Sequence, residues 1–147
     1  MKLINKNKKA YFDYEVIDEY TAGIILTGPE IKSIRGGHVN LKGGYVSIQN
    51  VEAFLKNVNI SRYKHDSSSD YDPFRIRKLL LKEVELHKII NHLNTQGVTV
   101  IPLAIGLEGK YAKIQIGVVR GKKKHDKRHS IKDRDVKRQM DRITKNY

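Results

Sequence analysis

Lysine and arginine side chains cluster at four places in this 147-residue sequence, and tyrosines lie between the clusters. Each phosphate neutralised by such a cation adds affinity that falls with salt. An exposed aromatic ring adds about 1–3 kcal/mol for each stacked base, without requiring one base sequence. The clusters are Lys6, Lys8 and Lys9; Lys32 and Arg35; Arg75, Arg77 and Lys78; and residues 120–128, and the tyrosines are Tyr11, Tyr14, Tyr45, Tyr63 and Tyr71. This combination predicts a polyanion-binding protein, and RNA is the favoured polyanion.

The strongest concentration of charge is at the C-terminal end, in residues 120–147. These 28 residues hold twelve Lys or Arg and four Asp, a net charge of +8 out of the +13 of the whole chain. A packed body with a basic arm is typical of proteins that bind a polyanion. We therefore expect an RNA-binding body at 1–119 and a basic tail at 120–147.

The six histidines do not have the spacing of a catalytic or metal site. His87 and His92 are five residues apart on an expected helix, about 140° apart around its axis. No His-Glu-x-x-His pattern occurs, and without Cys there is no Cys-based zinc site. We expect no catalytic residue, no metal and no cofactor. An enzyme is the alternative from another class, and its turnover would be lost on changing a His or an Asp.

Apolar runs in the sequence are all shorter than the ~20 residues of a membrane helix. The N-terminal residues 1–9 are polar and basic, with no apolar stretch behind them, so we expect no signal peptide. A basic surface can also bind anionic lipid, but the chain has no acylation site and its tail has no strong aromatic stripe. We expect a cytoplasmic monomer without a membrane partner.

The elements that must position the basic clusters are mainly short strands. Alternating apolar and polar residues predict about six of them, at 12–16, 24–26, 45–49, 53–56, 98–107 and 112–118. A short helix is expected from Gly28, with Pro29 at its first turn, and a longer one from Lys82 to near Gly97. Residues 61–73 predict a loop. Because no strand–helix–strand unit repeats, we expect a mainly β fold, a small closed antiparallel β-barrel with flanking α-helices and a basic C-terminal tail.

The tail has a second pattern beyond its charge. Val136, Met140, Ile143 and Tyr147 fall on one face of a possible helix. A helix of this length with so much like charge gains little stability by itself. We expect it to be disordered when free and helical when bound.

Several short motifs of the chain occur together and in a specific order. They are Asn7-Lys8-Lys9-Ala10, Ala22-Gly23-Ile24, Gly28-Pro29-Glu30-Ile31-Lys32-Ser33-Ile34-Arg35, Asn40-Leu41, Tyr45-Val46, Asp72-Pro73, Arg77-Lys78-Leu79-Leu80-Leu81 and Gly121-Lys122-Lys123-Lys124-His125-Asp126-Lys127-Arg128. From about residue 7 to its end, the sequence resembles the SmpB family, the bacterial SsrA-binding proteins.

The resemblance implies an oligonucleotide-binding-type β-barrel and an RNA-binding adaptor of trans-translation, the rescue of ribosomes stalled on broken messages. Such a protein binds the tRNA-like part of transfer-messenger RNA, replaces its missing anticodon arm and delivers it to stalled ribosomes for peptide tagging. It is not itself a catalyst, although it favours aminoacylation of its RNA. The tail enters the decoding centre of the small subunit and the empty messenger channel, where it folds as a helix. The alternative is a generic ribosomal or ribosome-assembly RNA-binding protein, which would prefer ribosomal RNA.

The resemblance also implies roles for individual residues. Matches place Asn7, Glu30, Lys32, Leu80 and Lys113 on or beside RNA-binding positions of the family. Together with the basic clusters and the other motifs, the expected RNA-binding residues are Asn7, Lys8, Lys9, Glu30, Lys32, Arg35, Asn40, Tyr45, Arg77, Lys78, Leu80 and Lys113. The expected ribosome-binding residues are Lys122, Lys123, Lys124, His125, Asp126, Lys127, Arg128 and Ile143, of which His125 matches a decoding-centre contact.

Two residues depart from the family pattern. Thr21 stands where the family commonly has a Glu that is implicated in RNA binding. Thr144 replaces a usually apolar neighbour of Ile143. We expect the first to change an RNA contact and the second to weaken packing of the tail helix.

Overall fold

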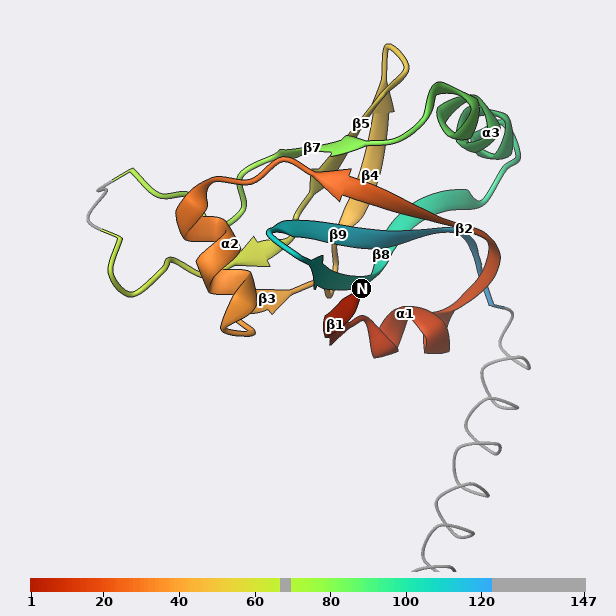
Figure 1. The fold of residues 1–147 in the computed structure, drawn as a ribbon. Helices are drawn as coiled ribbons and strands as arrows, with labels where there is room; N and C mark the ends of the chain where they lie inside the picture. Colours follow the sequence, from red (N-terminus) through yellow and green to blue (C-terminus); the bar gives the residue numbers. More distant parts are fainter. Residues whose placement is uncertain (67–69, 123–147) are drawn as a thin grey trace, which may run out of the picture.

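The computed structural model describes residues 1–66 and 70–122 (Figure 1). Within them the chain forms an antiparallel sheet with three helices at its margins. The elements in chain order are β1 (Lys2–Lys6), α1 (Lys8–Asp13), β2 (Tyr14–Ile24), α2 (Gly28–Arg35), β3 (Val39–Asn40), β4 (Tyr45–Gln49), β5 (Glu52–Lys56), β6 (Asn59–Ile60), β7 (Arg77–Leu80), α3 (Glu83–Leu93), β8 (Val98–Glu108) and β9 (Tyr111–Gly121).

Seven strands form one sheet in the order β1-β8-β9-β2-β7-β5-β4, and β3 pairs with β6 in a second, two-stranded sheet. Every pairing is antiparallel. The prediction of a mainly β, antiparallel fold with a few helices is confirmed.

The expected closure into a barrel is not found in the hydrogen bonding of the described residues. The large sheet ends at β1 and β4, and β4 lies beside β8 without a ladder between them. One physical reason is Pro102 in β8, which has no N–H to donate. Its carbonyl instead accepts a hydrogen bond from Asn7 Nδ2 at 3.0 Å.

The chain between residues 8 and 24 differs from its predicted structure. The strand expected at 12–16 is in fact the end of α1 and the start of β2, and β2 continues without a break through Gly23 to Ile24. Asn7 caps α1, because its Oδ1 accepts a hydrogen bond from Ala10 N at 3.3 Å. Gly23 does not make a turn but lies inside β2, where a Cβ would be in van der Waals contact with Leu80 Cβ at 3.4 Å.

Elements with strong local signals form as predicted. Thr27 and Glu30 make a reciprocal capping box at the start of α2, with Pro29 in the first turn. α3 begins after Lys82 as predicted, but it ends at Leu93 rather than near Gly97. The β4–β5 hairpin turns at Asn50 and Val51, both with positive φ. The predicted loop between β6 and β7 is present, although residues 67–69 lie outside the description.

Apolar side chains form two clusters, one on each face of the sheet. The larger cluster packs Ile34 of α2 and Ile89 of α3 against residues such as Ile114 of β9. The smaller one packs Ala10 of α1 against Leu103 of β8 and other side chains on the opposite face. Because α1 covers only one end of this second face, the other end stays open.

Candidate nucleic-acid interface

The open end of the sheet brings together two expected site residues that are 33 positions apart in the sequence. Gly23 of β2 pairs with Leu80 of β7 on one side and with Lys113 of β9 on the other. Directly paired residues project from the same face of a sheet, so Leu80 and Lys113 flank the glycine. Leu80 is 53% exposed, although it is apolar. We call Leu80, Gly23 and Lys113, with Thr21 two residues along β2, the sheet-face site.

The lysines of this face are only loosely paired. Lys113 Nζ lies 3.6 Å from Glu108 Oε2, and Lys78 Nζ, on the same strand as Leu80, lies 3.7 Å from Glu52 Oε1. All four side chains are 40% or more exposed. Exposed pairs of this kind contribute about 0–1 kcal/mol, so a phosphate can displace the carboxylates at little cost.

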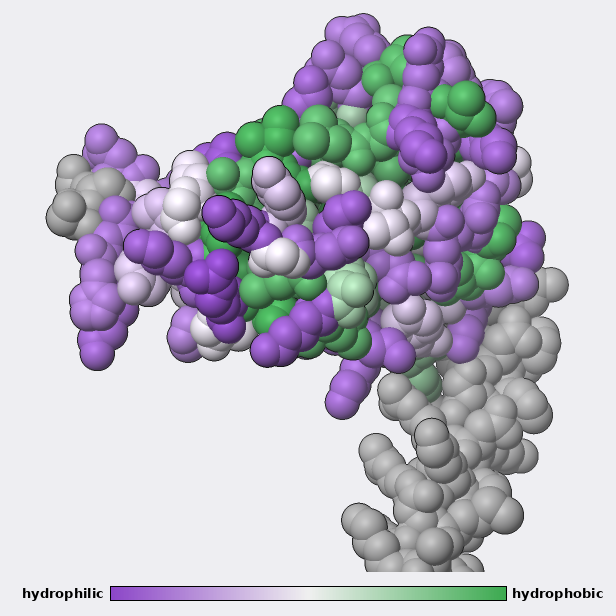
Figure 2. Space-filling view, in the orientation of Figure 1, coloured by the Kyte–Doolittle hydropathy of each residue, from purple (hydrophilic) through white to green (hydrophobic). Residues whose placement is uncertain are grey.

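Hydrophobic and hydrophilic patches alternate on the surface that Figure 2 shows.

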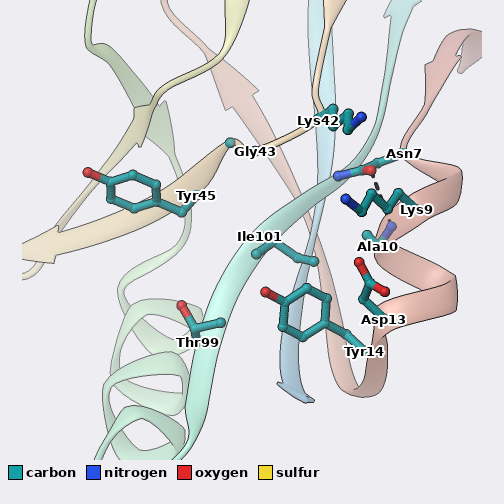
Figure 3. Close-up of a pocket in the computed structure, with 11 residues that line it drawn as sticks. Asn7, Lys9, Ala10, Asp13, Tyr14, Lys42, Gly43, Tyr45, Thr99 and Ile101 are labelled. Atoms are coloured by element: carbon teal, nitrogen blue, oxygen red, sulfur yellow. Dashed lines mark hydrogen bonds between the residues drawn. The ribbon is translucent and has the colours of Figure 1, made fainter. Parts of the chain in front are cut away.

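A second group of expected residues meets in a pocket of about 380 Å³ between α1, β8 and the turn that leads into β4 (Figure 3). Asn7 and Lys9 line it from the α1 side and Tyr45 from β4. Lys42 and Tyr14 complete a mixture of cationic and aromatic side chains. This pocket, which we call the α1–β4 pocket, has the side-chain types that contact phosphates and bases.

Lys42 was not expected, because a lone lysine in a turn carries no pattern. The two following glycines are the only local signal. A Cβ on Gly44 would lie 2.4 Å from Val58 Cγ2, so the turn passes too close to the body of the protein for any other residue. That close approach places Lys42 at the edge of the pocket.

Asn7 makes hydrogen bonds inside the protein through its backbone N–H and both polar atoms of its side chain. Its backbone N–H donates to Leu103 O at 2.7 Å, its Nδ2 donates to Pro102 O, and its Oδ1 caps α1. The side chain is buried. Asn7 therefore positions α1 and the neighbouring Lys8 and Lys9, both exposed, against β8.

Glu30 and Arg77 are also buried, at 1% and 0% exposure. Arg77 Nε donates to Glu30 Oε2 at 2.7 Å, its Nη1 to Val58 O at 2.8 Å and its Nη2 to Pro73 O at 3.1 Å. Arg75 Nη2 donates to Glu30 Oε1 at 2.5 Å. Arg77 was expected to contact RNA, but its guanidinium is inside the protein and joins α2 to Val58, just before β6, and to Pro73 in the β6–β7 loop.

The surroundings of Glu30 have opposing effects on its pKa. Burial raises the pKa of this carboxyl, but the hydrogen bonds from Arg75, from the Thr27 backbone and from Arg77, with the charge of Arg77, outweigh burial. The net result is a pKa below the ordinary 4.5. The carboxylate is therefore charged at neutral pH and fixes the two arginines.

The remaining expected residues are dispersed. Lys32 on α2 lies with its Nζ 5.3 Å from the centroid of the Tyr63 ring, and Arg35 is exposed at the end of the same helix. Asn40 Oδ1 accepts a hydrogen bond from Lys42 N at 3.0 Å, so Asn40 shapes the turn before β4.

Of the ribosome-binding candidates, the structure describes Lys122. Its backbone N–H donates to Asp13 O and its Nζ to Tyr11 O, both at 3.0 Å, which ties it to the end of α1. The others lie outside the described residues, as do Thr144 and the expected tail helix. They are Lys123, Lys124, His125, Asp126, Lys127, Arg128 and Ile143.

Residues 1–66 and 70–122 contain no group of three or more His, Asp or Glu placed to hold a metal ion. None of their helices combines the length and apolar character needed to cross a bilayer.

A mainly antiparallel sheet with exposed lysines, an exposed leucine and exposed aromatic rings on a chain of net charge +13 defines a basic β protein of the polyanion-binding class. A family model described as SmpB protein matches residues 4–146. The chain belongs to the SmpB family.

Individual relatives agree with this assignment. The SsrA-binding protein of Enterococcus hirae is 48% identical over 146 residues, which cover 99% of this chain and 95% of that protein. The SsrA-binding protein of Desulfitobacterium hafniense is 49% identical over 142 residues, covering 97% and 91%. A solved structure described as "tmRNA-SmpB: a journey to the center of the bacterial ribosome" superposes with a TM-score of 0.69 at 36% identity, covering 86% of this chain and 93% of that chain.

Proposed function

We propose that this protein binds the tRNA-like part of transfer-messenger RNA and delivers it to stalled ribosomes for rescue and peptide tagging. The observation that carries the proposal is the sheet-face site. Leu80 and Lys113 belong to separate parts of the sequence, both match RNA-binding positions of the family, and the strand register places them on either side of Gly23. Relatives at 48–49% identity are named SsrA-binding proteins.

The chemistry of this surface suits structured RNA. RNA double helices are recognised mostly by shape and by contacts to phosphates and 2′-hydroxyl groups. The half-exposed Lys78 and Lys113 supply cations, while the exposed Leu80 supplies an apolar contact to a sugar or base. Thr21 is neutral, so the contact that the family makes here with a Glu carboxylate becomes a hydroxyl contact in this chain.

The finer fold assignment is part of the proposal. An oligonucleotide-binding fold is a partly open, five-stranded Greek-key barrel. The position of β4 beside β8 without a ladder is compatible with a partly open barrel.

Four further expectations stay predictions. They are the division between body and tail, the absence of catalysis, a monomeric state and a cytoplasmic location.

The tail is proposed to act on the ribosome. Residues 121–128 match the family's junction motif, in which His125 matches a decoding-centre contact, and Ile143 matches an apolar position beyond it. In this proposal the body binds the tRNA-like RNA, while the tail enters the messenger channel, which is empty on a stalled ribosome.

A competition experiment tests the function. The full chain is bound to the labelled tRNA-like part of transfer-messenger RNA at physiological salt, and unlabelled transfer-messenger RNA or bulk ribosomal RNA is added. We expect transfer-messenger RNA to compete at far lower concentration. Equal competition by ribosomal RNA would favour the generic ribosomal RNA-binding alternative, for which the basic charge of the chain is the only support.

A further inference from the structure

A second cavity lies apart from the sheet-face site and the α1–β4 pocket, between the end of α2 and the chain that follows β6. Its volume is about 460 Å³. The side chains that give it its chemistry are Lys32, His38, Arg62, Tyr63, Lys64 and His65. No carboxylate belongs to its lining among the described residues, so this cleft, which we call the α2 cleft, is cationic and aromatic.

Two aromatic rings and a lysine lie close together in the cleft, and the lysine lies over one of the rings. The rings of Tyr63 and His65 meet edge to face, with centroids 5.4 Å apart and planes at 71°. Lys32 Nζ lies 5.3 Å from the Tyr63 centroid. An aromatic ring next to a lysine offers a stacking surface for a base and a cation for its phosphate within one nucleotide of each other.

The floor of the cleft is held by hydrogen bonds. Ser33 Oγ donates to Ser61 O, and His38 accepts from Ser61 N at 3.0 Å through its backbone carbonyl. The His38 backbone N–H in turn donates to Ser33 O at 2.9 Å. These bonds join α2, the start of β3 and the end of β6. Because this backbone is already fixed in the free protein, less conformational entropy is lost when a ligand binds.

Space beside His38 is limited as well. A Cβ on Gly36 would lie 3.0 Å from His38 Cδ2 and 3.3 Å from its Nε2. The imidazole therefore packs over the glycine at the end of α2. This contact places His38 at the edge of the cleft, where an imidazole can donate to a phosphate.

We propose that the α2 cleft binds one unpaired nucleotide of RNA, with the base on Tyr63 and the phosphate between Lys32 and Lys64. This inference rests on the proposed function and adds a contact to it. Of the six side chains, Lys32 was among the expected RNA-binding residues and Tyr63 among the tyrosines expected to stack on bases. The nucleotide can come from the tRNA-like RNA or from ribosomal RNA, and both present the same base and phosphate chemistry.

Binding measurements on the full chain test the proposal in two arms. One arm measures the affinity for the tRNA-like part of transfer-messenger RNA, and the other the affinity of the preformed complex for stalled ribosomes. We expect Tyr63→Ala to weaken binding about five- to tenfold in one arm, because the stacked ring is lost. Tyr63→Phe keeps the ring and should stay within about twofold of the wild type. The arm that changes identifies the source of the nucleotide.

Lys64→Ala tests the phosphate contact, with Lys88→Ala on the exposed side of α3 as the matched control. Both variants remove one positive charge, so a smaller affinity for Lys64→Ala alone separates a local contact from general attraction. Unchanged binding in both arms for Tyr63→Ala and Lys64→Ala would overturn the inference. The competition experiment on the wild type decides the proposed function independently of these variants.

Amide chemical shifts supply a measurement that needs no variant. Titration of the full chain with a uridine hexamer should move the amides of residues 36–38 and 61–65 together. Movement confined to the sheet-face site and the α1–β4 pocket would also contradict the inference.

Discussion

Leu80 and Lys113 lie exposed on either side of Gly23, whereas Glu30 and Arg77, which come from equally specific motifs, are buried. The first two side chains can meet a ligand directly. The other two are linked to each other, and Arg77 also donates to the backbone carbonyls of Val58, just before β6, and of Pro73 in the β6–β7 loop. At the residue scale, residues that match a family motif therefore divide into two groups: some can contact a ligand, and others hold the structure in position.

Lys113→Ala is the corresponding prediction for a contact residue. Loss of one cation near a phosphate should weaken binding to the tRNA-like RNA and reduce the slope of log K against log salt by about one. Affinities measured at several salt concentrations give this slope. Lys88→Ala on α3 is the control, and an equal change in slope for both variants would mean that Lys113 acts only through net charge.

At the element scale, α2 is attached to the rest of the protein by ion pairs as well as by the apolar packing of Ile34. Glu30 in its first turn joins Arg75 and Arg77, which lie before and at the start of β7. Arg77 also holds Val58 O and Pro73 O, so the same guanidinium closes the loop next to α2. The α2 cleft and the positions of Lys32 and Arg35 depend on this attachment.

Stability at low pH should depend on Glu30. Its pKa in the folded protein lies below the ordinary 4.5, so its contribution is complete above about pH 4.5 and is lost as the pH falls through the folded-state value. Glu30→Gln leaves Arg77 buried without its charged partner and should cost about 3 kcal/mol of unfolding free energy at pH 7. Urea unfolding of both proteins between pH 7 and pH 3 should show this difference shrink below pH 4.5.

The exposed Glu52 provides the control for that experiment. Its only ion pair among the described residues is the 3.7 Å contact with the half-exposed Lys78. Glu52→Gln should therefore change the free energy of unfolding by less than about 1 kcal/mol at either pH. A constant difference between wild type and Glu30→Gln across the pH range would contradict the role assigned to the Glu30 charge.

At the scale of the whole molecule, the last strand of the sheet extends into the residues expected to begin the tail, at 120 and 121. β9 runs through Arg120 to Gly121, which pair with Glu15 and Tyr14 of β2. Arg120 Nη2 also donates to Glu15 Oε2 at 2.9 Å, and Lys122 contacts α1. A body that ends at residue 119 would lose these contacts, so a body of residues 1–122 is the better unit for experiment.

Truncation after residue 122 should separate the two proposed activities. We expect the chain 1–122 to keep specific binding to the tRNA-like RNA, because the sheet-face site and both pockets are retained, and to lose peptide tagging on stalled ribosomes. Gel shifts and a tagging assay measure the two. A thousandfold loss of specific affinity at physiological salt would show that the division into body and tail is wrong. The chain 1–119 should in addition unfold at a lower urea concentration.

Much of the fold could be predicted from the sequence where the controlling interactions are local. The capping box of Thr27 and Glu30 spans three residues, and the turn at Asn50 joins neighbouring strands, so α2 and the β4–β5 hairpin carry their own signals. The basic composition and the ordered motifs likewise identify the family without any coordinates. These features depend on residue type and short spacing alone.

Only the tertiary structure decided how distant residues meet. Nothing near Gly23 in the sequence indicates that it lies inside a long strand between Leu80 and Lys113, because strand register depends on pairing across the whole sheet. Nor does the sequence distinguish the buried Arg77 from the half-exposed Lys78 beside it. Alternate residues of a strand project to opposite faces, so packing, rather than charge, determines which of two neighbouring cations can reach an RNA.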